Sequence, residues 1–144
     1  MVSRLALTVS LMVGCIWCLA IATQADNGQR ELENPPFTPV ASVESLMHGQ
    51  KTFFKAVAKE LAKPASADRN HEIHEAVEVL AELANVNRYN NKKKDYRAWA
   101  TKLRDTALEM AAETKKKDDV DTGRLQELYQ SMKDTCAACH DVYQ

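Results

Sequence analysis

LQELYQSMKDTCAACHDVY, residues 125–143, carries a side chain able to face a core at every third or fourth position. This spacing predicts one face of an amphipathic helix over residues 122–143. The last two turns of that face hold two thiols and an imidazole, so the face carries reactive side chains as well as side chains that pack into a core. Its expected inward members are Leu125, Leu128, Tyr129, Met132, Cys136, Cys139, His140 and Tyr143.

Cys136-Ala137-Ala138-Cys139-His140 has the C-x-x-C-H spacing typical of c-type haem attachment. In that chemistry both thiols form thioethers to the porphyrin, and the imidazole becomes the proximal iron ligand. On a helix, Cys136 and His140 stand one turn apart on the same face. Two other interpretations are half of a zinc site, which needs two further ligands, and a reducible CxxC pair, which is expected near a βαβ pattern. This chain shows no βαβ pattern, so we favour haem.

The sequence after residue 40 favours helix almost throughout. It contains two glycines, one proline and no alternating pattern long enough for a strand. Four helices with short connections predict an all-α, up-down-up-down bundle, a fold that holds cofactors between its helices. The expected helices span 41–62, 67–85, 93–116 and 122–143. The expected inward residues of the first three are Val43, Met47, Gln50, Phe54, Val57, Leu61, Ile73, Val77, Leu80, Leu83 or Ala84, Tyr96, Trp99, Leu103, Ala107 and Met110, with Leu46 and Phe53 at the edge.

In that topology the last helix ends where the first begins, the second ends and the third begins. The haem is therefore expected near the C-terminus, at this end of the bundle. Its expected neighbours are Val43, Leu46, Met47, Leu80, Leu83, Ala84, Tyr96 and Trp99.

The first 25 residues have the order of a signal peptide, with Arg4, then an apolar run over 5–22, then Thr23-Gln24-Ala25. We expect cleavage and export, with an uncleaved membrane anchor as the alternative because a run of roughly 18 apolar residues can span a bilayer. Residues 26–39 are expected to be a linker and 40–144 the bundle domain. Cys15 and Cys18 would leave with the signal, so Cys136 and Cys139 are the only cysteines expected in the mature chain.

Charge is nearly balanced, with 19 Lys and Arg against 20 Asp and Glu. The chain lacks the strongly basic field that nucleic-acid binding requires. No arrangement of nucleophile and base stands out either, so we do not predict an enzyme.

Three segments together resemble the class II c-type cytochromes, the cytochrome c-prime family. They are Ser45-Leu46-Met47, Ala98-Trp99 and the C-terminal CAACHDVY, and the resemblance covers about residues 40–144. It implies haem c attached at Cys136 and Cys139, His140 on the iron, a redox partner protein and a location in the bacterial periplasm. Family members often form homodimers through outer helix faces; here the oligomeric state stays open. This chain ends in Gln144 where members often carry arginine, and it lacks their arginine early in the first helix, so the propionate contacts are not predicted.

The family contains two functional types, and the sixth iron ligand separates them. Low-spin members place a methionine of the first helix on the iron and transfer electrons; five-coordinate members bind NO or CO. Met47 matches the ligand position and is our expected distal ligand, with core packing as the alternative. His48 is a rival ligand, but it points about 100° further round the helix.

Other polar residues carry weaker signals. His71 and His74 could complete a Cys2His2 zinc site by composition, but they open the second helix, away from the motif, and are expected to be surface histidines. Arg88 and the lysines at 92–94 could meet propionates or a partner; we expect them to form a solvated loop.

Overall fold

The computed structural model describes residues 38–116 and 119–143. The chain divides into two units, Met1–Thr38 and Pro39–Gln144, and the second holds every helix described below. The predicted signal peptide and nearly all of the predicted linker lie outside the described residues. Among the described helices, none is long and apolar enough to cross a membrane.

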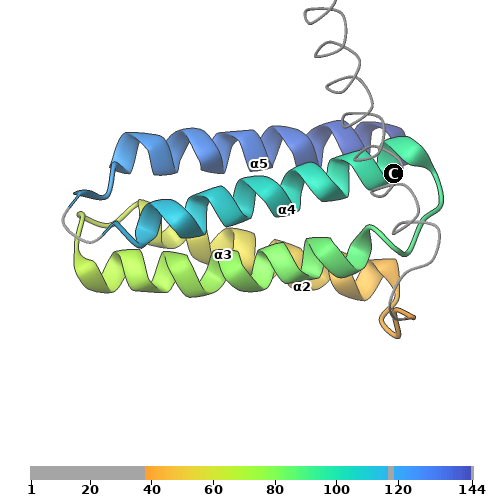
Figure 1. Cartoon of the computed structure of the whole chain (residues 1–144), viewed down its shortest axis with the longest axis horizontal. Coiled ribbons are helices and arrows are strands. Elements are labelled where there is room, and N and C mark those ends of the chain that lie inside the picture. The colour runs from red at the N-terminus through yellow and green to blue at the C-terminus, as the bar shows by residue number, and fades with distance from the viewer. Residues whose placement is uncertain (1–37, 117–118, 144) are drawn as a thin grey trace, which may run out of the picture. The chain divides into compact units, whose positions relative to one another are not determined.

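Four helices and no strands make up the described part of the second unit, which confirms the all-α class (Figure 1). Their bounds lie within two residues of the predicted ones. The helices are α2 (Val43–Leu61), α3 (Ala67–Asn87), α4 (Lys94–Thr114) and α5 (Thr122–Tyr143).

Side-chain caps explain where α2 and α3 begin. Ser42 Oγ accepts the Ser45 N–H at 3.1 Å, and Ser66 Oγ accepts the Arg69 N–H at 3.1 Å. Each bond satisfies a backbone donor that the first helical turn leaves unpaired. The end of α3 lies two residues later than predicted. Asn87 is buried and accepts a 2.8 Å hydrogen bond from the Tyr96 hydroxyl, so a contact with α4 holds an asparagine that local propensity would place in a turn.

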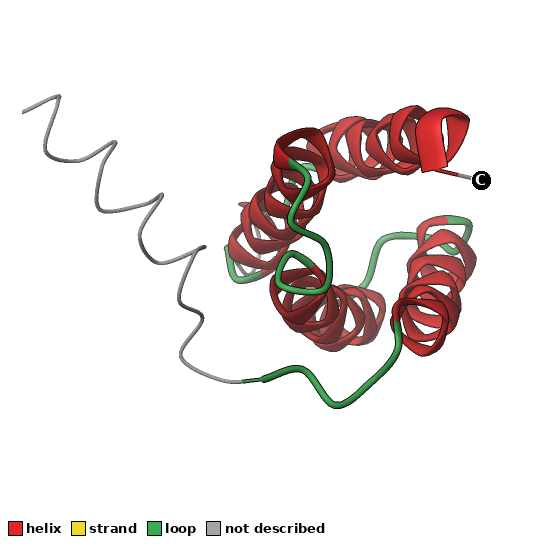
Figure 2. Ribbon diagram, turned by 90° about the vertical axis from the view of Figure 1, so that its right-hand side faces the viewer, coloured by secondary structure: helices red, strands yellow, loops and turns green. Residues whose placement is uncertain are grey.

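The core lies between consecutive helices, because α2 packs on α3, α3 on α4, and α4 on α5. By contrast, α2 and α5 make few direct contacts, and Figure 2 shows their two ribbons standing apart. One exception is a stacked pair, Phe54 on Tyr129, with ring centroids 4.4 Å apart. The largest fully buried side chains are Ile73, Leu80, Met110, Leu125, Met132, Val57 and Val77.

The prediction that Val43 points inward was wrong. Val43 is 36% exposed, whereas Leu46, expected at the edge, is 5% exposed. The rotation of α2 is set by its neighbour: a Cβ placed on Gly49 would lie 3.1 Å from Leu83 Cδ1, so the two helices approach closely there. This contact also directs Leu83 toward α2 rather than toward the cysteines.

Arg69 was not singled out from sequence, yet it is 3% exposed and ties three segments together. Its Nη2 donates to Thr122 Oγ1 at 3.2 Å, at the start of α5, and to Asn70 Oδ1 at 2.8 Å. Its Nη1 lies 3.5 Å from the Lys63 carbonyl oxygen, just after α2. The start of α3 is therefore fixed against the two neighbouring helix ends.

Candidate functional site

A groove of about 540 Å³ lies where the first half of α2 faces the last half of α5. Met47 and Gln50 contribute to its α2 side, and Cys136 and His140 to its α5 side. A smaller cavity of about 30 Å³ shares these four residues and reaches inward to Cys139. Leu80 of α3 and Leu103 of α4 also line the groove, so all four helices contribute.

The C-x-x-C-H motif lies on a continuous helix, in the last two turns of α5. Cys139 is 8% exposed, and Cys136 and His140 are half-buried. Both cysteines are free. The structure therefore brings the two thiols, the imidazole and the Met47 thioether to one pair of adjoining cavities. Of the other expected neighbours, Leu80, Tyr96 and Trp99 also line them, while Val43, Leu46, Leu83 and Ala84 do not.

Five of the residues that were predicted to be inward but are only half-buried share a location. Met47 and Phe54 on α2, and Tyr129, Cys136 and His140 on α5, all belong to the two helices with few mutual contacts. Fully buried residues of α5, such as Leu125 and Met132, belong instead to the common core. The helical pattern thus predicts the correct face, but the α2 side of that face borders a groove rather than a packed interior.

The two thiols have the electrostatics of buried, neutral cysteines. Burial raises the pKa of Cys136, and the neighbouring Cys139 raises it further. The pKa of Cys139 is also raised, first by burial and then by the negative charge of Asp95. Catalytic and redox-active cysteines usually have a lowered pKa, because the thiolate is the reactive form. The two thiols therefore do not have the lowered pKa that is typical of a reactive CxxC pair.

An aromatic cluster holds the end of α5 directly after His140. Tyr143 packs edge-on against Tyr96 and Trp99, with centroid distances of 5.4 and 6.0 Å. Its hydroxyl donates to Asp95 Oδ1 at 2.6 Å, and Lys93 Nζ lies 4.9 Å from the centre of its ring. Sequence reasoning placed Tyr96 and Trp99 here but missed Asp95. The available signal was an acidic residue in the first turn of the helix predicted to border the C-terminal tyrosine.

The bond between Asp95 and Tyr143 predicts a specific pH dependence. It raises the pKa of Tyr143 from 10.0 to about 12 and lowers that of Asp95 from 3.8, because the hydroxyl donates to the carboxylate. Between about pH 10 and 12 the folded chain keeps a proton that the unfolded chain has lost, so this contribution to stability falls as the pH rises. At the acid end it is lost as the pH falls below 3.8 toward the lowered pKa of Asp95.

Ultraviolet titration of tyrosinate should show a step near pH 12. The step should be absent in Tyr143→Phe and should shift toward pH 10 in Asp95→Asn, which keeps an acceptor oxygen but removes the charge. An unchanged step in both variants would show that this bond does not form in solution.

The charged residues near this end differ in burial. The lysines at 92–94 are exposed, as expected, although Lys94 is the first residue of α4 rather than part of the loop. Arg88, expected to be solvated, is only 9% exposed; its Nη2 donates to Tyr89 Oη at 2.8 Å, and its guanidinium lies 4.8 Å from the centre of that ring. His48 is exposed but lines the rim of the groove beside Met47.

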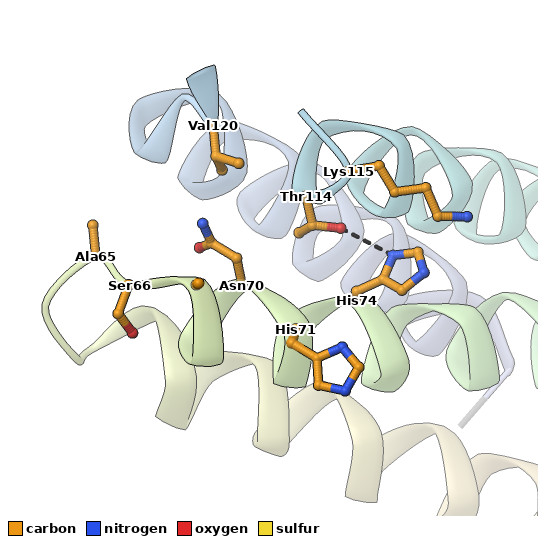
Figure 3. A pocket seen from close by; sticks show the side chains of 9 residues that line it. Ala65, Ser66, Asn70, His71, His74, Thr114, Lys115 and Val120 are labelled. Atoms are coloured by element: carbon orange, nitrogen blue, oxygen red, sulfur yellow. Dashed lines mark hydrogen bonds between the residues drawn. The ribbon is translucent and has the colours of Figure 1, made fainter. Parts of the chain in front are cut away.

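His71 and His74 line a separate cavity of about 570 Å³, between the start of α3 and the end of α4 (Figure 3). His71 is exposed, but His74 is half-buried, which corrects its predicted surface position. His74 Nδ1 lies 3.0 Å from Thr114 Oγ1, and Nε2 lies 3.1 Å from Glu78 Oε1, so His74 joins α3 to α4. Across residues 38–116 and 119–143, no group of three or more His, Cys, Asp or Glu side chains is placed to hold a metal ion. The two histidines therefore do not combine with Cys136 and Cys139.

Comparisons of this chain with protein-family models, with curated proteins and with solved structures found no match.

Proposed function

We propose that this chain is a c-type haem protein that transfers single electrons. In this proposal it is an up-down-up-down four-helix bundle of the class II cytochrome c type, with haem c attached through Cys136 and Cys139. The observation that supports it most is the groove in which a C-x-x-C-H helix faces a methionine thioether. The groove volume of about 540 Å³ lies within the roughly 300–1,000 Å³ usual for cofactor sites.

The residues around the groove fit haem by their chemistry. Cys136 and Cys139 offer thiols from one helix face for thioether bonds, and His140 offers an imidazole beside them. Met47, on the opposite wall, would offer a soft thioether as a second protein ligand to the iron. Leu80 and Leu103 add apolar surface to the groove.

When bound, haem supplies a one-electron couple, and His/Met ligation raises its potential. The residues of the chain supply the rest. The hydrogen bond from Tyr143 to Asp95 fixes the turn that follows His140, and the aromatic rings of Tyr96 and Trp99 line the inner cavity. The proposal includes no substrate turnover.

The proposal also covers location and partner. Haem attachment of this type agrees with export to the bacterial periplasm, with residues 1–25 as a cleaved signal, and the partner is another redox protein. Membrane attachment follows only if the N-terminal segment is retained.

A five-coordinate haem protein that binds NO or CO is the second candidate. One observation favours it: Met47 is half-buried at the edge of an open groove, so it can also serve as packing beside a vacant iron position. In that case His140 is the single protein ligand.

Visible spectra of the protein, produced together with a haem-attachment system, test both candidates. Electron transfer predicts a low-spin spectrum in the oxidised and reduced forms and slow CO binding limited by ligand displacement. A high-spin spectrum with fast CO binding would move the assignment to gas binding. A colourless protein would contradict both and favour a bundle without haem.

A further inference from the structure

Gln50 is a buried polar residue that the proposed function does not yet use. It is 7% exposed, and its Nε2 has no hydrogen-bond partner in the described part of the chain. It lines both the groove and the inner cavity, together with Met47, Cys136 and His140. A buried amide without a partner costs its full desolvation energy, and such groups in native proteins call for a functional explanation.

The helix geometry places Gln50 next to Met47 on one face of α2. Gln50 follows Met47 by three residues on α2, so the two side chains are neighbours on one face. Side chains of a helix lean toward its N-terminus, so a rotation within the Gln50 side chain would bring its amide to the Met47 sulfur, with which it makes no hydrogen bond in this structure.

Of the other polar side chains that line the inner cavity, Asn87, Tyr96 and Thr135 already take part in hydrogen bonds. Asn87 Oδ1 accepts the Tyr96 hydroxyl at 2.8 Å. The Thr135 hydroxyl donates to the Ser131 carbonyl at 2.8 Å. Of the three sulfur atoms that line this cavity, that of Met47 lies on the same helix as Gln50, three residues before it and on the same face.

We propose that Gln50 is a positioning residue for Met47, with its Nε2–H donating a hydrogen bond to the methionine sulfur. This inference rests on the proposed function. A thioether sulfur has two lone pairs, so one can face the iron while the other accepts the amide proton. The hydrogen bond would keep the other lone pair available to the iron, and it would withdraw electron density from the sulfur, which would favour the reduced state. Axial ligation and hydrogen bonds around it are established determinants of a haem potential.

Gln50→Leu removes the donor at similar side-chain volume. We expect the equilibrium constant for reduction to fall by up to about tenfold, which corresponds to a potential lower by about 59 mV for a one-electron couple. A pocket that only becomes more apolar should shift the potential upward, so the direction separates the two effects. Gln126→Leu is the matched control, because Gln126 is an exposed glutamine of α5 and its replacement should leave the potential unchanged.

A second measurement needs no variant. In the reduced, diamagnetic protein, NMR should show a nuclear Overhauser contact between the Gln50 side-chain amide protons and the Met47 methyl group. This contact decides the question if Gln50→Leu does not fold.

The outcomes separate this inference from the function itself. Absence of haem would contradict the proposed function. A haem protein with Met47 on the iron, no such contact and an unchanged or higher potential in Gln50→Leu would overturn the role of Gln50 alone. A haem protein in which Met47 is not a ligand would overturn it as well, while leaving covalent attachment intact.

Discussion

Replacing Cys136 and Cys139 together with alanine should abolish covalent haem attachment. The two thiols are the only cysteines of the described chain, and both line the inner cavity beside His140. Without them no thioether bond can form, so the intact mass of the denatured protein should be that of the polypeptide alone. The wild-type chain, produced with the same haem-attachment system, should be heavier by one haem.

The variant should still fold, which makes the loss interpretable. Alanine has the highest helix propensity. Burial raises the pKa of both thiols and keeps them neutral, so the substitution removes no charge. Far-ultraviolet circular dichroism should therefore show a helical protein, although the missing cofactor lowers its thermal stability, since a bound group stabilises the state that binds it.

The chain offers a matched control in its second CxxC pair. Cys15 and Cys18 have the same spacing but lie in the predicted signal, and no histidine follows them. The double variant Cys15→Ala, Cys18→Ala should leave haem attachment unchanged. Covalent haem in the Cys136, Cys139 variant, or its loss in the Cys15, Cys18 variant, would contradict the assignment.

Helix positions could be predicted from sequence because their signals are local. Apolar residues at helical spacing, a serine before α2 and another before α3, and Pro64 between those helices define the elements. The predicted range of α5 agrees with the structure at both ends. The grouping of Cys136, Cys139 and His140 on one helix face follows from the same periodicity.

Contacts between distant residues could not be predicted in the same way. The hydrogen bond from Tyr143 to Asp95 joins residues 48 positions apart, and the bond from Arg69 to Thr122 joins residues 53 positions apart. Val43 is exposed and Leu46 is buried, contrary to the prediction, because of how α2 is rotated against α3. The close contact at Gly49 sets this rotation. Periodicity predicts the buried face of a helix to within one residue. Packing against the neighbouring helices then decides which of the adjacent residues are buried.

The groove itself is a further feature that hydrophobic patterning does not predict. A continuous apolar face on α5 normally indicates a packed interior, yet the part of that face near α2 borders open space. The pattern is the same in both cases because a cofactor of the proposed kind needs apolar walls just as a core does. Only the C-x-x-C-H motif within this face distinguishes a cofactor groove from a packed core.

Met47→Leu should convert the protein from low spin to high spin in the oxidised state and lower its reduction potential. Leucine nearly conserves the volume, and exchanges of this kind usually cost less than about 1.5 kcal/mol, so packing should survive. The thioether is lost, and with it the increase in potential that His/Met ligation provides. The measurements are visible spectra, in which the long-wavelength band of iron–methionine ligation should disappear, together with a redox titration.

Met110→Leu is the control that separates ligation from packing. Met110 is a fully buried core residue in the second half of α4, away from the cysteines, and it lines neither cavity of the site. Its replacement tests the same change of side chain in a more demanding packing environment, and the spectrum and potential should not move.

If Met47→Leu behaves in the same way, with an unchanged spectrum, then Met47 is a packing residue. The half-buried methionine beside the groove would then mark an iron with one open position, and CO should bind the variant and the wild type at the same rate. If only the Met47 variant changes, the opposing walls of the groove supply one axial ligand each, His140 from α5 and Met47 from α2, and electron transfer is the function that this geometry supports.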